Sequence, residues 1–292
     1  MKPKISALSL LAVSSCLAAQ LAAANGVKIT PDVVYGHKDG MALTFDVLRP
    51  ASGANRAAVL VMVSGGWISR WSAPEPFAGR MKPLLDTGFT VFLVRHGSSP
   101  KYNLTEAVAD VRRAVRYVRL HGADLGIDPN RIGVTGGSAG GHLALMLGTA
   151  SDDGDPDAKD EVLRASDRVA AVVAYFPPVD LRETNRRIMA GVDVGMLERF
   201  RPAFTFDMSL AASVSPLLQV TPDDAPTLLV HGDKDLVVDV AASRQMHKAF
   251  QEKGVPTDLI VIEGAGHGFQ GEDAARALRA MVAWFDNYLA QK

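Results

Sequence analysis

The chain has 292 residues, of which 48% are hydrophobic, and its 31 basic and 32 acidic residues leave a formal net charge of -1. A chain of this size and hydrophobic content can bury one sizeable core, which predicts one α/β domain or one domain with an insertion. The nearly balanced charge disfavours nucleic acid or an anionic membrane surface as the main partner.

Residues 1–24 have the pattern of a secretory signal peptide. A positively charged start precedes a short apolar run at 5–13, and the three alanines at 22–24 offer a small-residue cleavage site. The apolar run is too short for a stable membrane span. We therefore expect a secreted or periplasmic mature chain that begins near residue 25 and forms a single domain, 25–292.

Cys16 is the only cysteine, and it lies inside the predicted leader. An alternative interpretation makes it a lipoprotein attachment site, but the alanine-rich sequence after it resembles the remainder of a signal peptide. Removal of the leader would leave no thiol for a disulfide, for catalysis or for a thiolate metal site. The sequence thus indicates a fold that depends on its core, with no cofactor and no metal.

The mature chain begins with a predicted antiparallel pair at 27–35 and 43–48, joined by a turn at 38–40. Near-continuous apolar runs, typical of strands buried on both faces, then alternate with helical patterns. The strands are expected at 57–63, 89–94, 131–135, 169–175, 227–230 and 259–262, and the helices at 104–121, 240–253 and 274–289. This alternation predicts a mostly parallel sheet with helices on both faces.

Two charged stretches receive structural interpretations. Arg112, Arg113, Arg116 and Arg119 lie on one helical stretch, where a solvated helix face is favoured over a binding patch. The acidic residues 151–160 are expected to form a mobile surface loop, with metal binding by their carboxylates as the less favoured alternative.

An insertion at 181–214 separates two predicted core strands. Insertions at this point of an α/β sheet lie over the carboxyl ends of the strands, where ligands bind. Two interpretations stay open: a cap that shapes a substrate pocket, and a small helical decoration with its own apolar contacts.

Ser138 lies in Gly136-Gly137-Ser138-Ala139-Gly140, between a predicted strand and a helical run. Small residues at such a turn allow a strained backbone that exposes the serine hydroxyl. Side chains at the flanking glycine positions would collide with the neighbouring strand and helix. The following helix N-terminus favours negative charge, and the N–H of Ala139 is a predicted oxyanion donor. For the motif alone, an incidental serine in a glycine-rich turn is the alternative.

A serine nucleophile needs a base, and the base needs a partner that fixes its tautomer. His267 lies in a glycine-rich loop between the last predicted strand and the last helix. The acid is expected between the serine and the histidine in the chain. Asp233 and Asp235 both follow the strand at 227–230. We favour Asp235, with Asp233 turning the loop through local backbone hydrogen bonds.

The second oxyanion donor is expected in the loop after an early strand. Gly65, Gly66 and Trp67 follow the strand at 57–63, and glycines let the backbone approach a substrate closely.

Aromatic residues near this loop are expected to line the pocket together with the insertion. Trp67, Trp71 and Phe77 suit an apolar or aromatic acyl group, or a sugar ring. His96 is a further pocket candidate, for which a structural role is the favoured interpretation.

Taken together, these motifs resemble the α/β-hydrolase superfamily, and most of all its secreted esterase and lipase-like branch of feruloyl, acetylxylan and related carboxylesterases. The resemblance covers most of the mature chain and implies an α/β-hydrolase fold with a small cap insertion. By motif match it implies Ser138, Asp235 and His267 as nucleophile, acid and base. One departure is that Val63 and Ser64 stand where the family's His-Gly-Gly-x-Trp loop often has histidine and glycine.

The resemblance implies a serine hydrolase that cleaves carboxylic esters through an acyl-enzyme, with a small-molecule or carbohydrate-linked substrate. One alternative is a peptidase or amidase of the prolyl-oligopeptidase type, which usually carries a further large domain. Another is a non-catalytic binding module on the same fold. The sequence does not indicate the oligomeric state or which ester is cut.

Overall fold

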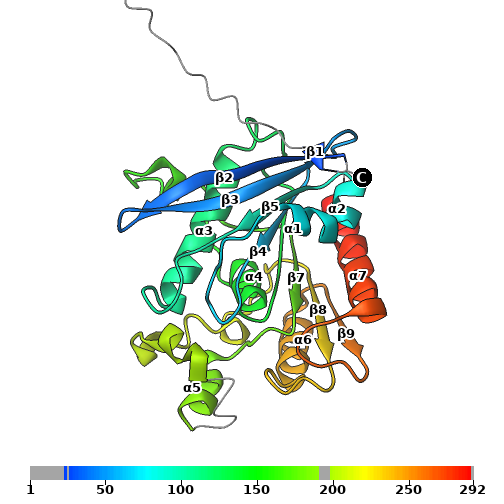
Figure 1. Ribbon diagram of the computed structural model, residues 1–292. Helices are drawn as coiled ribbons and strands as arrows, with labels where there is room; N and C mark the ends of the chain where they lie inside the picture. Colours follow the sequence, from blue (N-terminus) through cyan, green and yellow to red (C-terminus); the bar gives the residue numbers. More distant parts are fainter. Residues whose placement is uncertain (1–22, 25, 191–197, 291–292) are drawn as a thin grey trace, which may run out of the picture.

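A nine-stranded sheet forms the centre of the protein, whose computed structural model describes residues 23–24, 26–190 and 198–290 (Figure 1). The strand order is β1-β2-β3-β5-β4-β6-β7-β8-β9. In this order, the neighbours β1–β2, β2–β3 and β3–β5 are antiparallel. All the following neighbours, from β5–β4 to β8–β9, are parallel. The predicted mostly parallel sheet with an initial antiparallel pair is therefore confirmed.

The described strands lie close to the predicted ones. They are β1 (Ala23–Ala24), β2 (Val27–Lys38), β3 (Met41–Pro50), β4 (Ala58–Met62), β5 (Thr90–Val94), β6 (Ile132–Gly137), β7 (Ala171–Tyr175), β8 (Thr227–Gly232) and β9 (Thr257–Ile262). The α-helices are α1 (Glu75–Arg80), α2 (Lys82–Asp86), α3 (Leu104–Leu120), α4 (Ala139–Thr149), α5 (Leu181–Met189), α6 (Ala241–Lys253) and α7 (Gly271–Leu289). Helices α1 and α2 were not predicted, because five or six residues are too few for a helical hydrophobic period.

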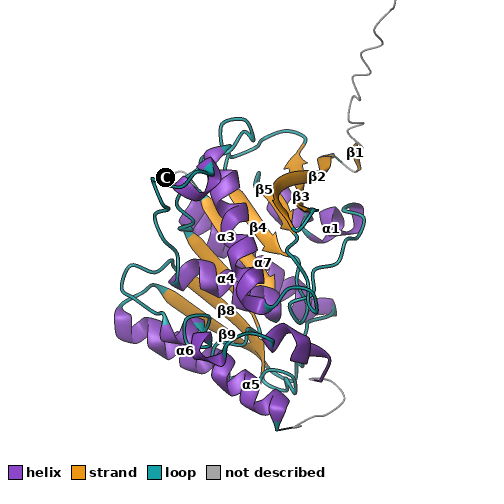
Figure 2. Cartoon of the chain, turned by 90° about the vertical axis from the view of Figure 1, so that its left-hand side faces the viewer, coloured by secondary structure: helices purple, strands orange, loops and turns teal. Residues whose placement is uncertain are grey.

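The helices cover both faces of the sheet, and each face has its own buried cluster (Figure 2). On one face, α3, α4 and α6 contribute apolar side chains such as Val111, Leu143 and Phe250. On the other face, α2 and α7 contribute Leu84 and Phe285. Burial of large apolar side chains stabilises a fold by about 1.5–3 kcal/mol each, so these two clusters fix the sheet between its helical layers.

Helix α3 begins at a capping box. The side chain of Asn103 accepts hydrogen bonds from the N–H groups of Thr105 and Glu106, and the Glu106 carboxylate accepts from the Asn103 N–H. Asn103 therefore caps the helix.

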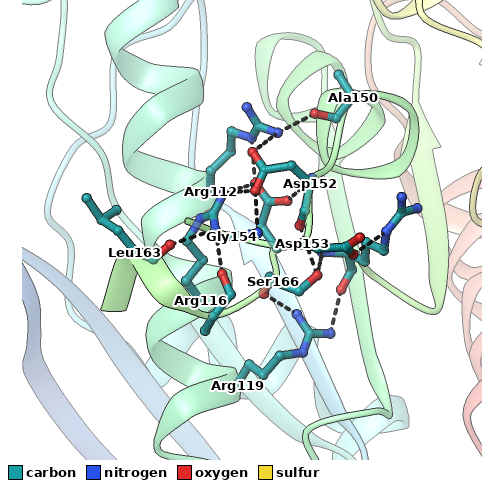
Figure 3. A network of polar contacts seen from close by, with 12 residues as sticks. Arg112, Arg116, Arg119, Ala150, Asp152, Asp153, Gly154, Leu163 and Ser166 are labelled. Atoms are coloured by element: carbon teal, nitrogen blue, oxygen red, sulfur yellow. Dashed lines mark hydrogen bonds and ion pairs between the residues drawn. The ribbon is translucent and has the colours of Figure 1, made fainter. Parts of the chain in front are cut away.

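The arginines of α3 lie in a network of polar contacts and not on the solvated helix face that the sequence predicted (Figure 3). Arg116 is only 7% exposed, and it forms ion pairs with Asp152 and with the fully buried carboxylate of Asp167. Arg112 pairs with the same two carboxylates, and Arg113 pairs with Asp160.

The predicted solvated helix face is thus wrong. Arg119 joins the network by donating hydrogen bonds to the carbonyls of Ser166 and Arg168. The acidic segment 151–160, which was expected to be mobile, is held against α3 by these contacts. The sequence pattern could not reveal this, because the partners lie roughly forty residues away along the chain.

The insertion at 181–214 contains α5 and two 3₁₀ helices, η2 (Glu198–Phe204) and η3 (Met208–Leu210). Its residues 191–197 lie outside the described residues. Figure 1 shows α5 at the lower end of the molecule, far from the β2–β3 pair at the top.

Most of the predicted leader, residues 1–22, also lies outside the described part of the chain, whereas Ala23 and Ala24 pair with β2. Among the described residues, no helix is long and apolar enough to cross a membrane.

Candidate active site

Ser138 occupies the sharp turn between β6 and α4. Its backbone has φ 55° and ψ -122°, a conformation that is rare and strained for a residue with a side chain. A Cβ on Gly136 would lie 2.4 Å from the Gly140 carbonyl oxygen, and a Cβ on Gly140 would lie 2.6 Å from the Met62 carbonyl oxygen. The two glycines therefore permit the close passage of strand and helix that the sequence predicted.

His267 and Asp235 are brought together by the loops after β9 and β8. The Nδ1 atom of His267 donates to Oδ2 of Asp235 at 2.7 Å, and within the described residues no hydrogen bond uses Nε2. The Asp235 carboxylate is fully buried, while the His267 side chain is 22% exposed. This arrangement fixes the histidine tautomer and leaves its second nitrogen accessible from the cavity described below.

The charge of Asp235 is strongly favoured. Burial by itself raises the pKa of this carboxyl, but hydrogen bonds from His231, His267 and the Val238 N–H outweigh burial and bring the pKa well below its usual range. The N–H groups of Val237 and Val238 both donate to Oδ1, at 2.8 and 2.9 Å. Asp235 is therefore a carboxylate at neutral pH and can stabilise positive charge on His267.

Asp233 has a different role. Its Oδ1 atom accepts a hydrogen bond of 2.6 Å from the N–H of Gly264, which is 31 residues away and precedes His267. The expectation of a purely local turn contact is therefore wrong: Asp233 ties the loop after β8 to the loop that carries His267.

The loop after β4 leaves two of its three candidate donors free. The N–H of Gly65 donates to the carbonyl of Ile68 at 3.0 Å, and the Ile68 N–H returns a bond to Gly65. Within the described residues, no hydrogen bond uses the N–H of Gly66 or Trp67. The N–H of Ala139, in the first turn of α4, has no intrahelical partner either. Gly66, Trp67 and Ala139 can therefore supply oxyanion donors, and Gly65 cannot.

Trp67 is held by a residue of the nucleophile helix. Its indole Nε1 donates to Nδ1 of His142 at 3.2 Å, and the His142 Nε2 donates to the Val214 carbonyl at 2.8 Å. Burial lowers the pKa of His142 to about 4, so this imidazole is neutral and can accept from Trp67. One histidine thus links the loop after β4, helix α4 and the end of the insertion.

Two cavities meet at Ser138, and both are lined by Gly66, Phe200 and Val237 as well. The α5 cavity, of about 710 Å³, extends from Trp67 between α5 and the start of α6. The His267 cavity, of about 770 Å³, extends past His267 to the loop after β4 and α1.

Ser138 and His267 both line the His267 cavity, and no hydrogen bond joins their side chains in this structure. Such a bond is often long in a free site and closes when the substrate binds.

The four residues predicted to line the pocket lie in different places, and Trp67 lines the α5 cavity. Phe77 lines the His267 cavity. Trp71 is 64% exposed and lines neither cavity. His96 also lines neither: it is buried, its Nδ1 donates to the Gly97 carbonyl, and its Nε2 accepts from the Ser64 hydroxyl at 2.8 Å. His96 therefore holds Ser64 of the loop after β4 through this hydrogen bond, in agreement with the structural role that the sequence favoured.

Sequence reasoning missed several residues of the site. The ring of Phe176, directly after β7, lies 4.6 Å from the His267 ring, and Phe176 has a positive φ of 38°. A Cβ on Gly66 would lie 2.2 Å from the ring of Phe200, which shows how closely the insertion covers the loop after β4. His231 lies 3.3 Å from the Asp235 carboxylate.

The sequence held one signal for these missed contacts. His142 follows Ser138 by four residues, and His231 precedes Asp235 by four residues. The contact of His231 with Asp235 is local, whereas the partners of His142, Trp67 and Val214, come from other parts of the chain. Among the described residues, no group of three or more His, Cys, Asp or Glu side chains could hold a metal ion.

Comparison with solved structures finds proteins of similar fold. An acetyl ester-xyloside bifunctional hydrolase from Caldicellulosiruptor lactoaceticus has a similar structure, with a TM-score of 0.74 and 25% identity over 88% of this chain and 95% of that chain. Thermogutta terrifontis esterase 2 phosphonylated by sarin also matches, with a TM-score of 0.74 and 25% identity over 89% and 96% of the two chains. The fold is thus that of the α/β-hydrolase superfamily.

Sequence comparison places the chain more narrowly. The BD-FAE family model matches residues 45–250, well over half of the chain, and the chain belongs to this family. Esterase LipQ of Mycobacterium tuberculosis is 31% identical over 261 residues, which cover 87% of this chain and 60% of LipQ. The chain spans about 60% of the length of this and two further esterase relatives. The predicted resemblance to the esterase branch is confirmed.

Proposed function

We propose that this protein hydrolyses carboxylic esters through a triad of Ser138, His267 and Asp235. The observation that carries the proposal is the 2.7 Å contact between His267 and Asp235 beside a cavity that the strained Ser138 also lines. Its similarity to named esterases, LipQ among them, supports the same activity.

In the proposed reaction, the Oγ atom of Ser138 attacks the ester carbonyl carbon while Nε2 of His267 takes the hydroxyl proton. Asp235 stabilises the resulting imidazolium. The negative charge on the carbonyl oxygen is stabilised by the Ala139 N–H and by the free N–H groups of Gly66 and Trp67. The alcohol leaves with the proton from His267, and water, activated by the same histidine, then releases the acid from the acyl-enzyme.

We further propose that the protein is exported and that its substrates are carbohydrate-linked esters. Export is supported by the charged start and the apolar run of residues 1–24. The carbohydrate-linked substrate is supported by the similarity to a hydrolase named for an acetyl ester and a xyloside, and to a carbohydrate esterase from gut microbiota.

Replacement of Ser138 tests the function directly. We expect Ser138→Ala to lower kcat for 4-nitrophenyl acetate by about 10⁴-fold or more, the order seen when a catalytic serine is removed. A fluorophosphonate probe should label the folded wild type and not the variant. Ser209→Ala is the matched control, because Ser209 is exposed on η3 and lines neither cavity.

Unchanged ester hydrolysis by Ser138→Ala would contradict the triad. A faster reaction with 4-nitroacetanilide than with 4-nitrophenyl acetate would favour the peptidase or amidase alternative. Absence of both labelling and hydrolysis in correctly folded wild-type protein would favour the binding module.

A further inference from the structure

The His267 cavity carries a concentration of positive charge. Arg70, Arg80 and Arg199 all line it, and its lining has no Asp or Glu among the described residues. The whole chain has nearly equal numbers of basic and acidic residues, 31 and 32. The excess of positive charge in the lining of this cavity is therefore local and does not follow from the composition of the chain.

Within the described part of the chain, these three arginines have no carboxylate partner. All three are exposed, and none forms an ion pair with a carboxylate of the described residues. The guanidinium of Arg80 lies 4.5 Å from the centre of the Phe77 ring, and that of Arg199 lies 4.8 Å from the Phe200 ring. Stacking on a ring orients a guanidinium and leaves its N–H donors available for an anion.

The α5 cavity differs in its charges. Its lining contains three carboxylates, those of Asp180, Glu183 and Asp239, and two guanidinium groups, those of Arg186 and Arg187. Glu183 pairs with Arg186, and Asp180 pairs with Arg182 outside the lining, so this cavity has no excess of positive charge among the described residues. Of the two cavities that meet at Ser138, only the His267 cavity presents an excess of cationic donors.

The position of His267 decides which part of an ester occupies the cationic cavity. The general acid must reach the oxygen of the leaving alcohol in order to protonate it. His267 lines the His267 cavity and does not line the α5 cavity. The alcohol portion therefore extends into the cavity with the arginines, and the acyl portion extends into the α5 cavity.

We propose that the preferred substrates are esters whose alcohol portion carries a carboxylate, which Arg70, Arg80 and Arg199 bind. A guanidinium presents parallel N–H donors that match a carboxylate. Phe77, Phe176 and Ile68 line the same cavity and suit an apolar ring between the ester oxygen and the anionic group. This inference rests on the ester hydrolysis proposed above and specifies its leaving group.

The test compares two acetyl esters that differ in one charge. 4-Acetoxybenzoate carries a carboxylate on its alcohol portion, and 4-acetoxybenzamide is its neutral counterpart. The quantity measured is kcat/KM for each ester, and the ratio of the anionic to the neutral value is compared among proteins. Intrinsic reactivity then cancels, because every protein acts on the same two esters.

We expect Arg70→Gln, Arg80→Gln and Arg199→Gln each to lower this ratio by about two- to fivefold, the effect of losing one exposed charge contact. The triple variant should lose more than any single one. Added salt should lower the wild-type ratio, since exposed charges are screened. Arg276→Gln is the matched control: Arg276 is exposed on α7, lines neither cavity, and should leave the ratio unchanged.

A ratio that is unaffected by the arginine substitutions, in protein that hydrolyses the neutral ester, would overturn this inference and leave the proposed function intact. Absence of hydrolysis of the neutral ester would instead contradict the proposed function. Phenyl hydrogen succinate, whose acyl portion carries the carboxylate, tests the orientation. If its hydrolysis depended on the arginines and that of 4-acetoxybenzoate did not, the assignment of the alcohol to the His267 cavity would be wrong.

Discussion

Asp235 and Asp233 stand two residues apart after the same strand, and the fold gives them separate tasks. Asp235 turns into the loop, where two backbone N–H groups and His267 surround its buried carboxylate. The side chain of Asp233 accepts a hydrogen bond from the Gly264 N–H of the neighbouring loop, and its backbone N–H donates to the Ile262 carbonyl. The two carboxylates differ in burial and in the donors from which they accept hydrogen bonds. The same substitution, aspartate to asparagine, is therefore expected to have different effects at the two positions.

We expect Asp235→Asn to lower kcat for 4-nitrophenyl acetate by about 10³- to 10⁴-fold, because an amide neither fixes the histidine tautomer nor stabilises imidazolium. Asp233→Asn should lower it by less than about tenfold, since an amide oxygen can still accept from Gly264. Steady-state kinetics of the two variants, with folding checked by circular dichroism, decide the matter. Equal losses in both would contradict the assigned roles.

The sequence indicated the three proposed catalytic residues, but not the residues that hold them and the neighbouring loops in place. Chain order and motif spacing indicated Ser138, Asp235 and His267, because each residue lies at a strand end that its own local sequence reveals. The supports come from elsewhere: Phe176 packs on His267, and Val214 accepts from His142. Contacts between elements distant in the chain depend on tertiary packing, which a single sequence does not display.

At the scale of elements, the arginines of α3 have the spacing typical of a solvent-exposed helix face, but they form a network of ion pairs with the segment 151–167. Arg112 and Arg116 together compensate the charge of the fully buried Asp167 carboxylate, and Arg116 also pairs with Asp152. An unpaired buried charge is strongly destabilising, because the low-polarity interior does not replace the lost hydration. The packing of the 151–167 segment on α3 therefore depends on these side chains.

We expect Arg116→Met to lower the free energy of unfolding by about 1.5–3 kcal/mol, because Arg112 still compensates Asp167 while Asp152 and the Ala165 carbonyl lose a charged donor. Lys82→Ala, which removes the exposed pair of Lys82 with Asp86, should change it by less than about 1 kcal/mol. Urea unfolding, followed by circular dichroism, measures both. A loss for Arg116→Met as small as that of the surface pair would show that the network does not hold the segment.

At the scale of the whole molecule, three histidines are buried among the described residues, and two of them, His96 and His142, connect the stability of the protein to pH. Burial lowers the pKa of His96 and of His142 to about 4. In the unfolded chain an imidazole has a pKa of about 6.5. Between these values the unfolded chain binds protons that the folded chain does not, so the free energy of unfolding falls as the pH falls from about 6.5 to about 4.

Each of the two histidines is expected to contribute up to about 3 kcal/mol to this loss. His142→Gln should lower stability at pH 7.5, because Trp67 loses a well-placed acceptor, and should also flatten the decline of stability between pH 6.5 and 4. The exposed His37, replaced by Gln, is the control and should retain the wild-type slope. Urea midpoints at several pH values supply the measurement. A wild-type slope in His142→Gln would contradict the prediction.

The sequence by itself determined the alternation of strands and helices, the turn at Ser138 and the chain order of the three site residues. These features are encoded locally, in hydrophobic period, glycine placement and motif spacing. The tertiary structure decided which aspartate meets His267, which N–H groups of the loop after β4 are free, and that three arginines line one cavity. Each of these depends on which distant segments lie side by side, and therefore on the packing of the whole chain.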